Sequence, residues 1–264
     1  GDGDLIGDAY EYLMRNFASQ SGKSKGQFYT PAEVSRLMAK IIIYDPACGS
    51  GSLLLRAMNE TARGTAVNLY GQEKDLATIN MARMNMILHG MYTADLQHGD
   101  TLNVPLHHEG NQLQQFQYVV ANPPFSLKKW KKSAKDNDVY GRWKADAIPP
   151  SSKGDYAFLM HIVKSILPNG KGACILPHGV LFRGSVEKGD AEAKLRKALI
   201  ESHIIKGIIG LPANLFYGTG IPACIIIIDK AAAKDSKGIF MIDAKDGFYK
   251  DGAKNRLREQ DIQR

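Results

Sequence analysis

The stretch that decides the fold reads Tyr44-Asp45-Pro46-Ala47-Cys48-Gly49-Ser50-Gly51-Ser52. It connects an apolar run to a helical run, and therefore predicts a turn between a buried strand and a helix. Gly49 and Gly51 permit a tight turn and a close approach of the backbone to a ligand. Ligands of open α/β sheets bind outside the carboxyl ends of the strands, where this turn would lie. An ordinary glycine turn without a ligand is the alternative for a bare Gly-x-Gly pattern.

The alternation of apolar strand and helix continues outward from this turn. It predicts strands at 42–45, 68–73, 95–98, 118–121, 173–176, 204–209, 223–228 and 239–242, and helices at 52–62, 75–89, 156–167 and 191–202. Such alternation is typical of a mostly parallel central sheet with helices on both faces, so we predict an α/β, Rossmann-like fold. The last strands have less helix between them, which predicts one antiparallel pairing at the edge of the sheet.

Two further helices are expected before the turn. Residues 5–17 carry an amphipathic stripe, and Thr30-Pro31-Ala32-Glu33 combines a capping residue, a proline at the first helical position and a capping-box acid. The second helix runs into Ile41-Ile42-Ile43-Tyr44 without a turn residue. We therefore expect a few loop residues to be missing from the numbering at that joint.

Composition narrows the class of protein. A length of 264 residues suits one large α/β domain or two small ones, and 23% charged residues argue against a disordered or membrane protein. The three cysteines are far apart, which fits neither a zinc site nor a disulfide framework and indicates a reducing cytoplasm. The formal charge of +7 favours a polyanionic partner, although many basic proteins bind no nucleic acid.

Acidic residues follow the first three predicted strands. Asp45 precedes the glycine turn, and Glu73 ends the next strand, where a carboxylate can accept hydrogen bonds from both ribose hydroxyls. Asp100 follows the third strand and can accept one from an adenine amino group, with a turn or helix-capping aspartate as the alternative. A phosphate-binding loop has a lysine after its glycines, and this turn has none. The pattern favours a nucleoside without phosphates, such as S-adenosylmethionine.

The most informative stretch ends another predicted strand with Asn122-Pro123-Pro124-Phe125. The exocyclic amine of adenine is a poor nucleophile, because its lone pair is delocalised into the ring. The Asn122 side-chain oxygen and the Pro123 carbonyl can accept the two amino hydrogens and favour a pyramidal nitrogen, while Phe125 offers a π-face to the base. An Asn-Pro turn after a strand is the alternative.

A basic loop at 127–135 follows directly. Lys128 and Lys129 precede Trp130, and lysines interleaved with tryptophan suit phosphate contacts beside an extruded base. A solvated charged loop is the alternative.

Together these motifs resemble the N6-adenine DNA methyltransferases, and most closely the modification subunit of type I restriction–modification systems. The supporting stretches are 7–13, 23–31, 45–51, 122–125, 177–184 and 210–222. The resemblance covers essentially the whole chain. It implies a Rossmann-like S-adenosylmethionine-dependent methyltransferase fold, and site-specific transfer of a methyl group to adenine N6 in double-stranded DNA.

The resemblance also implies partners and a domain arrangement. The expected partners are double-stranded DNA, a specificity subunit, a restriction subunit and a second copy of the modification subunit, with no membrane. Residues 1–30 would be an N-terminal helix and a segment that covers the cofactor, residues 31–244 the catalytic domain, and residues 245–264 the start of a charged tail. Family subunits are longer, so we expect this chain to be a fragment.

The predicted site residues fall into three groups, without a metal ligand set. The cofactor-binding residues are Gln27, Phe28, Tyr29, Thr30, Asp45, Pro46, Ala47, Gly49, Ser50, Gly51, Glu73, Asp100 and Asn122. The catalytic residues are Asn122, Pro123, Pro124 and Phe125, and the substrate-binding residues are Phe125, Phe216, Lys128 and Lys129. The resemblance supplies the roles of Gln27, Phe28, Tyr29 and Thr30 over the cofactor and of Phe216 against a flipped base.

Two other functions fit part of the pattern. Methyltransferases that act on rRNA or on a protein glutamine share the Asn-Pro-Pro-aromatic motif, although they usually carry tyrosine after the prolines. A catalytically silent DNA-binding scaffold would keep the fold, but the intact Asp45, Glu73 and Asn122 argue against it.

Overall fold

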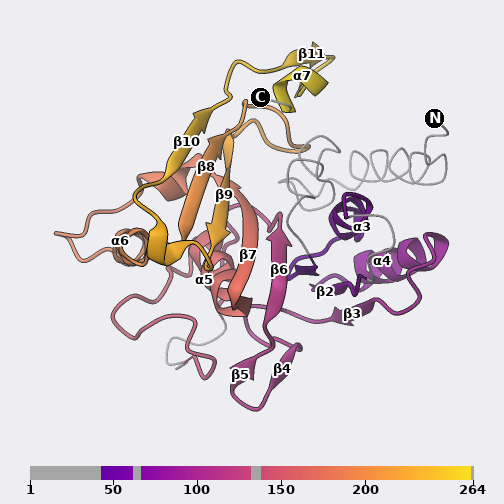
Figure 1. The fold of residues 1–264 in the computed structure, drawn as a ribbon, viewed down its shortest axis with the longest axis horizontal. Coiled ribbons are helices and arrows are strands. Elements are labelled where there is room, and N and C mark those ends of the chain that lie inside the picture. Colours follow the sequence, from indigo (N-terminus) through magenta and orange to yellow (C-terminus); the bar gives the residue numbers. More distant parts are fainter. Residues whose placement is uncertain (1–42, 62–66, 132–137, 263–264) are drawn as a thin grey trace.

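An eight-stranded sheet forms the centre of the computed structural model, which describes residues 43–61, 67–131 and 138–262 (Figure 1). Its strands, in spatial order, are β10 (Phe240–Asp243), β8 (Ile205–Gly210), β9 (Ala223–Asp229), β7 (Ile166–Pro177), β6 (Phe116–Ala121), β1 (Tyr44–Asp45), β2 (Tyr70–Glu73) and β3 (Asp95–His98). All neighbours pair in parallel except those of β9. The predicted α/β fold with a mostly parallel sheet is confirmed.

The position of the antiparallel strand differs from the prediction. β9 lies inside the sheet and pairs antiparallel with both β7 and β8, while the edge strand β10 runs parallel to β8. The predicted antiparallel pairing at the edge is therefore wrong. The physical reason is the short connection between β8 and β9, which carries no helix, because a parallel return would need a long crossover.

Helices cover both faces of the sheet. The first hydrophobic cluster includes side chains of α3 (Ser52–Asn59) and α4 (Leu76–Leu88). The second cluster includes side chains of α5 (Asp155–Ser165) and α6 (Ala191–Glu201). α5 ends two residues before its predicted end, because Ile166 already pairs with Phe116 of β6.

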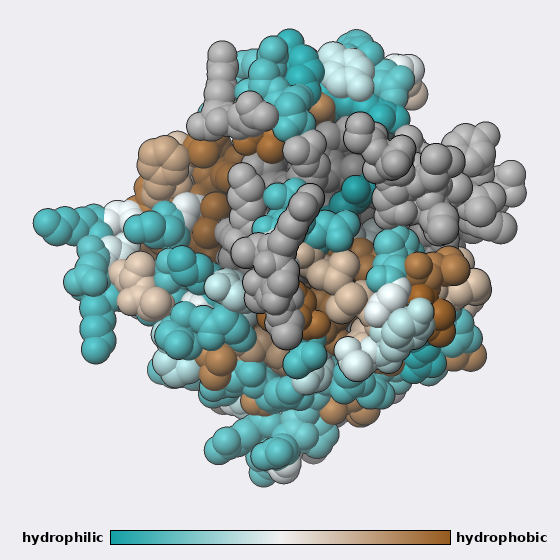
Figure 2. Space-filling view, turned by 45° about the vertical axis from the view of Figure 1, so that its right-hand side comes forward, coloured by the Kyte–Doolittle hydropathy of each residue, from teal (hydrophilic) through white to brown (hydrophobic). Residues whose placement is uncertain are grey.

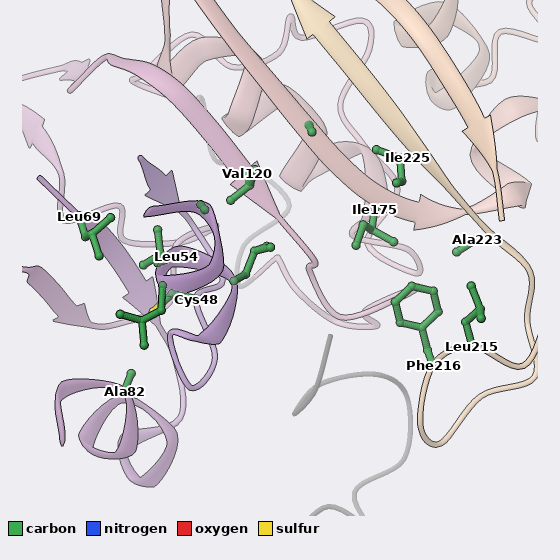
Figure 3. Close-up of a cluster of buried hydrophobic side chains, with 14 of the residues drawn as sticks. Cys48, Leu54, Leu69, Ala82, Val120, Ile175, Leu215, Phe216, Ala223 and Ile225 are labelled. Atoms are coloured by element: carbon green, nitrogen blue, oxygen red, sulfur yellow. The ribbon is translucent and has the colours of Figure 1, made fainter. Parts of the chain in front are cut away.

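Successive residues of the central strands point into different clusters, as the period of a strand requires. In β7, Ile175 lies in the first cluster and Leu176 in the second, and in β9, Ile225 and Ile226 divide in the same way. Figure 3 shows part of the first cluster, with Ile175 and Ile225 on neighbouring strands. These strands are buried on both faces, which explains why their sequences are continuously apolar.

Shorter elements complete the described fold. They are the hairpins β4 (His108–Glu109) with β5 (Gln112–Leu113) and β11 (Tyr249–Asp251) with β12 (Lys254–Arg256), the 3-10 helices η1 (His178–Leu181) and η2 (Ala233–Asp235), and the helix α7 (Glu259–Ile262). The segment predicted as a charged tail thus contains a hairpin, while the division of the chain at residues 30 and 244 stays a prediction.

The surface mixes hydrophilic and hydrophobic residues (Figure 2). On α4 the side chains of Leu76, Met84, Ile87 and Leu88 are exposed, whereas Ile79, Ala82 and Met86 are buried. In the part of the chain that the structure describes, no helix has the length and apolar character needed to span a bilayer. The predicted helix at 5–17, the helix start at Thr30 and the joint at Ile41-Ile42 lie outside the described residues.

Candidate active site

A cavity of about 370 Å³ lies where β1, β2, β3 and β6 end. Six of the predicted site residues line it: Pro46, Ala47, Glu73, Asp100, Asn122 and Pro124. The structure thus brings together residues that are up to 78 positions apart in sequence, from Pro46 to Pro124. Their convergence follows from the parallel sheet, because the carboxyl ends of parallel strands share one edge.

The predicted glycine turn is present between β1 and α3. Gly49 and Gly51 adopt φ of 54° and 78°, in the left-handed region that glycine tolerates best. A Cβ on Gly51 would lie 2.6 Å from Met86 Cε, so the Met86 side chain would have to shift. Gly49, Ser50 and Gly51 do not line the cavity, and their contact with a cofactor stays a prediction.

Glu73 joins the end of β2 to the glycine turn. Its Oε2 accepts a hydrogen bond from the Gly49 amide at 3.1 Å, and its Oε1 accepts one from the Asp75 amide at 2.9 Å. Burial raises the pKa of the Glu73 carboxyl above its usual range, while the Asp75 and Gly49 amides oppose the rise. The carboxylate is thus fixed in direction and lies at the cavity wall, where the prediction placed a ribose.

Asp45 is buried behind the cavity and does not line it. Its carboxylate accepts a hydrogen bond from the Ala47 amide at 2.9 Å. Burial raises the pKa of Asp45 to about 8; the Ala47 amide opposes the rise and the charge of Glu73 adds to it. Asp45 shapes the turn in this structure, and direct contact with a cofactor stays a prediction.

Asp100 lines the cavity and makes the turn-capping contacts considered from the sequence, while its contact with an adenine amino group stays a prediction. Its Oδ1 accepts hydrogen bonds from the amides of Leu102 and Asn103, as a turn-capping aspartate does. Its Oδ2 lies 2.7 Å from Lys74 Nζ. Burial would raise the pKa of Asp100, but the Lys74 ammonium and the Asn103 side chain hold it below its usual range.

The catalytic tetrapeptide leaves β6 directly beside the cavity. Asn122 and Pro124 line the cavity, whereas Pro123 and Phe125 are buried. The Oδ1 atom of Asn122 is itself buried. Asn122 therefore lines the same cavity as the predicted cofactor residues, whereas Pro123 and Phe125 are not among the lining residues.

Phe125 and Phe216, both predicted to contact the base, contact each other in this structure. Their rings meet edge to face, with centroids 5.4 Å apart and planes at 70°. Phe216 is fully buried in the first hydrophobic cluster, beside Leu215 on the loop that leads into β9 (Figure 3). A base cannot lie between rings in this arrangement, so a role of Phe216 in base binding would require its loop to move.

Trp130, which stands among the lysines of the basic loop, faces the protein interior. Its side chain is buried, its Nε1 donates to the Pro150 carbonyl at 2.8 Å, and its ring contacts Trp143. The tryptophan therefore attaches the basic loop to the protein and is not available for stacking on a base. Lys128 and Lys129 are exposed, which is the arrangement that phosphate contacts require.

Six cavity residues were missed from the sequence: Lys74, Asp75, Thr78, Thr101, Leu127 and Phe158. Asp75 has a readable signal, because it precedes a helix and its carboxylate accepts from the Thr78 amide at 2.9 Å. Thr101 donates to the Pro46 carbonyl at 2.6 Å, a contact across 55 residues that no local pattern predicts.

Four predicted cofactor residues cannot be placed. Gln27, Phe28, Tyr29 and Thr30 lie outside the described residues. Within the described ranges, no group of three or more His, Cys, Asp or Glu side chains is arranged to hold a metal ion. Cys48, Cys174 and Cys224 are buried as free thiols.

Comparison with known proteins identifies the relatives of the chain. The family model described as N-6 DNA methylase matches residues 1–264. The chain is 36% identical to the type I restriction enzyme MpnII methylase subunit of Mycoplasma pneumoniae, over 99% of this chain and 50% of that protein. The chain spans about half the length of the curated relatives it matches.

Solved structures give the same result. A type I restriction–modification system methyltransferase subunit from Streptococcus thermophilus is 38% identical, with a TM-score of 0.82, over 99% of this chain and 56% of that one. A putative class I S-adenosylmethionine-dependent methyltransferase from Listeria monocytogenes is 20% identical, with a TM-score of 0.67, over 89% of this chain and 71% of that one. At this identity the second likeness shows the fold alone.

Proposed function

This chain belongs to the N-6 DNA methylase family, and we propose that it transfers a methyl group from S-adenosylmethionine to adenine N6 in double-stranded DNA. We further propose that it acts as the modification subunit of a type I restriction–modification system. The names of its relatives support both statements, since the chain matches type I methylase subunits along almost its whole length.

The observation that carries this proposal is the shared cavity wall. Asn122, whose side-chain oxygen would bind the reacting amine, lines the same cavity as Glu73 and Asp100, which would bind a nucleoside. An acceptor for an amine beside a nucleoside site is what a methyl transfer from a nucleoside sulfonium to an exocyclic amine requires. Fixed geometry of this kind contributes most of the rate in such a displacement.

The residues present fit S-adenosylmethionine. The volume of about 370 Å³ lies in the usual range of small-ligand sites, roughly 300–1,000 Å³. Three carboxylates line the cavity, those of Glu73, Asp75 and Asp100, and they suit a cationic sulfonium better than a phosphate. Lys74 is also at the wall, but it is paired with Asp100. When bound, the cofactor would supply a methyl group on a positively charged sulfur.

The protein's own residues would bind and orient the amine. The Asn122 side-chain oxygen and the Pro123 carbonyl would accept the two amino hydrogens, and these hydrogen bonds would strengthen as the nitrogen becomes tetrahedral. Phe125 would contact the face of the base. A strong general base is unnecessary, because the amino proton becomes acidic once the nitrogen carries the methyl group.

The choice of DNA sequence would come from partner subunits. Lys128 and Lys129 are exposed beside the site, and lysines that contact phosphates carry no sequence information. We propose that a specificity subunit binds two modification subunits and reads the target, and that a restriction subunit joins for cleavage. The base would have to leave the duplex to reach the cavity.

Tritiated methyl transfer tests the proposed function. The full-length subunit, co-purified with the product of a neighbouring specificity gene, should label DNA, and mapping should find N6-methyladenine at one bipartite site. The subunit by itself should bind S-adenosylmethionine but label DNA weakly and without sequence preference. Transfer to rRNA or to a release factor in place of DNA would contradict the proposal, as would site-specific labelling by the subunit alone.

A further inference from the structure

The residue that follows the catalytic tetrapeptide has an unusual backbone conformation. Ser126 adopts φ of 51°, in the left-handed region that residues with a Cβ rarely occupy. Lys129, three residues later, also has a positive φ, of 52°. The turn that carries Phe125 away from the cavity therefore depends on a conformation that the chain does not favour by itself, and other parts of the protein must stabilise it.

Asp155, the first residue of α5, supplies this stabilisation. Its Oδ1 accepts a hydrogen bond from the Ser126 amide at 2.7 Å, and its Oδ2 lies 3.4 Å from Ser126 Oγ. The side chain is completely buried. Gly154 extends the contact, because its amide donates to the Leu127 carbonyl at 2.9 Å. α5 thus fixes two successive residues of the turn through their backbone.

A buried carboxylate needs a cationic partner, and Arg183 provides it. Its Nη2 lies 2.6 Å from Asp155 Oδ2 and 2.7 Å from Glu192 Oε1, and its Nε donates to Glu192 Oε2 at 3.0 Å. The three residues come from the start of α5, the segment after η1 and the first turn of α6. The two carboxylates raise the pKa of the Arg183 guanidinium even though burial opposes the rise, so the arginine stays charged.

The neighbouring backbone is shaped around the guanidinium. A Cβ at Gly179 would lie 2.5 Å from Arg183 Nη1, so only glycine leaves room for the arginine in this position. Arg196 of α6 donates to the Arg183 carbonyl at 2.8 Å, and Tyr156 of α5 donates to the Val180 carbonyl at 2.8 Å. The segment 178–183 is therefore attached to both helices, and Arg183 has little freedom to leave Asp155.

We propose that Asp155, Arg183 and Glu192 form a buried ionic brace that positions the catalytic loop for methyl transfer. The inference rests on the proposed function, because the loop in question is the one that would bind the adenine amine. Asp155 is a positioning residue: it touches Ser126, and Ser126 is four residues from Asn122. Without the brace, the turn would relax toward negative φ and shift Phe125 and the Asn122 side chain relative to the cavity.

The brace acts on the chemical step and leaves the cofactor site intact. None of its three members lines the cavity, and Glu73 and Asp100 have other partners. Loss of the brace should therefore lower the rate of transfer and leave cofactor affinity unchanged. A general loss of stability would lower both, which gives the proposal a measurable signature.

The test uses the full-length subunit assembled with its specificity partner. Single-turnover transfer of tritiated methyl groups to target DNA reports the chemical step, and calorimetry with S-adenosylhomocysteine reports cofactor affinity. Asp155→Ala should transfer about 10- to 100-fold more slowly, as expected when a hydrogen bond to a charged acceptor is lost, with affinity for S-adenosylhomocysteine within about twofold of wild type. Asp155→Asn keeps an acceptor and should lose less.

Glycine at position 126 distinguishes positioning from a structural role. Ser126→Gly removes the penalty on positive φ, so adding it to Asp155→Ala should recover at least about threefold in transfer rate. Glycine cannot repair a general defect of α5. If Asp155→Ala fails to fold, the same rescue is measured in Asp155→Asn, which replaces the carboxylate by an amide of nearly the same shape.

Asp229 provides the matched control. Asp229 is also buried. Its carboxylate accepts a hydrogen bond from the Ala232 amide at 3.1 Å and lies 3.4 Å from Lys171 Nζ. Asp229 is the last residue of β9 and pairs with Lys171, whereas the first residue of β9 pairs with Pro177, where β7 ends. Asp229→Ala should transfer at the wild-type rate. The brace is refuted by a wild-type rate in Asp155→Ala, by a parallel loss in Asp229→Ala, by a proportional loss of cofactor affinity, or by no rescue from Ser126→Gly. Absence of DNA labelling by the wild type would instead refute the proposed function, and the brace with it.

Discussion

The two halves of the candidate site are stabilised by contacts of very different sequence separation. On the cofactor half, Asp45, Glu73 and Asp100 each accept a hydrogen bond from an amide two residues further along the chain. On the half that would bind the base, Asp155 and Ser126 are 29 residues apart, and Lys254 and Phe216 are 38 residues apart. The cofactor half also has longer contacts, between Glu73 and Gly49, Lys74 and Asp100, and Thr101 and Pro46. The contrast therefore concerns the hydrogen bonds that each acid makes to its own following residues.

This difference predicts how each half responds to change. The loops of the cofactor half are stabilised largely by their own hydrogen bonds, so a substitution there should alter the cofactor half and leave the base half unchanged. The loops of the base half depend on α5, α6 and the β11–β12 hairpin, so distant substitutions should alter methyl transfer without altering cofactor binding. Four experiments test the contrast. They are ordered from the largest to the smallest expected change in the free energy of unfolding, of the transfer barrier or of cofactor binding.

The largest effect is expected at Asp45, as a dependence of stability on pH. Its pKa in the folded protein is about 8, above the unfolded value of about 3.9. The folded state therefore holds a proton that the unfolded state has released, and the stability contributed by the neutral carboxyl is present below about pH 4 and is lost as pH rises toward 8. Asp45→Asn does not titrate and keeps an oxygen for the Ala47 amide.

Urea unfolding between pH 5 and pH 8.5 measures this effect. The difference in unfolding free energy should move in favour of Asp45→Asn as pH rises, by on the order of several kcal/mol, at 1.36 kcal/mol for each unit of pKa shift. A constant difference across the range would show that Asp45 is ionised in the folded protein. The hydrogen bond from the Ala47 amide would then be made to an ionised Asp45 carboxylate.

The second effect is expected at Asn122, on the base half. Asn122→Ala removes the side-chain acceptor for the amine and should lower single-turnover transfer by about 100- to 1,000-fold, comparable to the loss of one oxyanion-hole donor elsewhere. Affinity for S-adenosylhomocysteine should change little. Asn169→Ala is the control, because Asn169 is exposed and lies near the start of β7. Near wild-type transfer by Asn122→Ala would remove the residue from the proposed mechanism.

The same contrast explains what the sequence could predict. The strands, the helices and the acids that follow β1, β2 and β3 are local features, because strand period, helix period and a carboxylate next to its own amide are all visible within a few residues. Asp45, Glu73 and Asp100 could accordingly be singled out from the sequence, and the last two line the cavity. Their contact with a cofactor stays a prediction. The sequence also predicted Asn122 at the end of β6, since the tetrapeptide follows an apolar run.

The features that the sequence could not predict depend on tertiary contacts. Trp130 stands among lysines in the sequence, yet it packs against Trp143 while Lys128 and Lys129 stay exposed. Phe216 stands in a loop rich in glycine and proline, yet it is fully buried. In both loops the polar neighbours suggested exposure of the aromatic ring, and only the packing of distant residues decides which side chains turn inward.

The third effect concerns Glu73. Glu73→Gln removes the charge and should weaken affinity for S-adenosylmethionine by about 10- to 100-fold, the range for a hydrogen bond to a charged group. Transfer at saturating cofactor should stay within about threefold of wild type, because Glu73 lies on the cofactor half. Glu201→Gln, on the exposed surface of α6, is the control. Unchanged affinity in Glu73→Gln, measured by calorimetry, would place the ribose elsewhere.

The smallest effect is expected at Lys254, which connects the β11–β12 hairpin to the loop that carries Phe216. Its Nζ donates to the Phe216 carbonyl at 2.6 Å and lies 3.4 Å from the Thr219 carbonyl and 5.7 Å from the centre of the Tyr217 ring. The next residue, Asn255, donates from its side chain to the Ala213 carbonyl at 2.8 Å. The hairpin thus fixes both ends of the turn around Phe216.

Lys254→Met keeps the apolar stem and removes the donors, which should reduce stability by about 1 kcal/mol, the net contribution of such hydrogen bonds. Because Lys254 hydrogen-bonds to the loop that carries Phe216, affinity for S-adenosylhomocysteine should be unchanged. Methyl transfer should change by a few fold, upward if Phe216 must leave its buried position to admit the base and downward if the observed position is the active one. Lys250→Met, at an exposed position of the same hairpin, should change neither quantity. A loss of cofactor affinity in Lys254→Met would show that the two halves are coupled and that the contrast between local and long-range contacts does not extend to function.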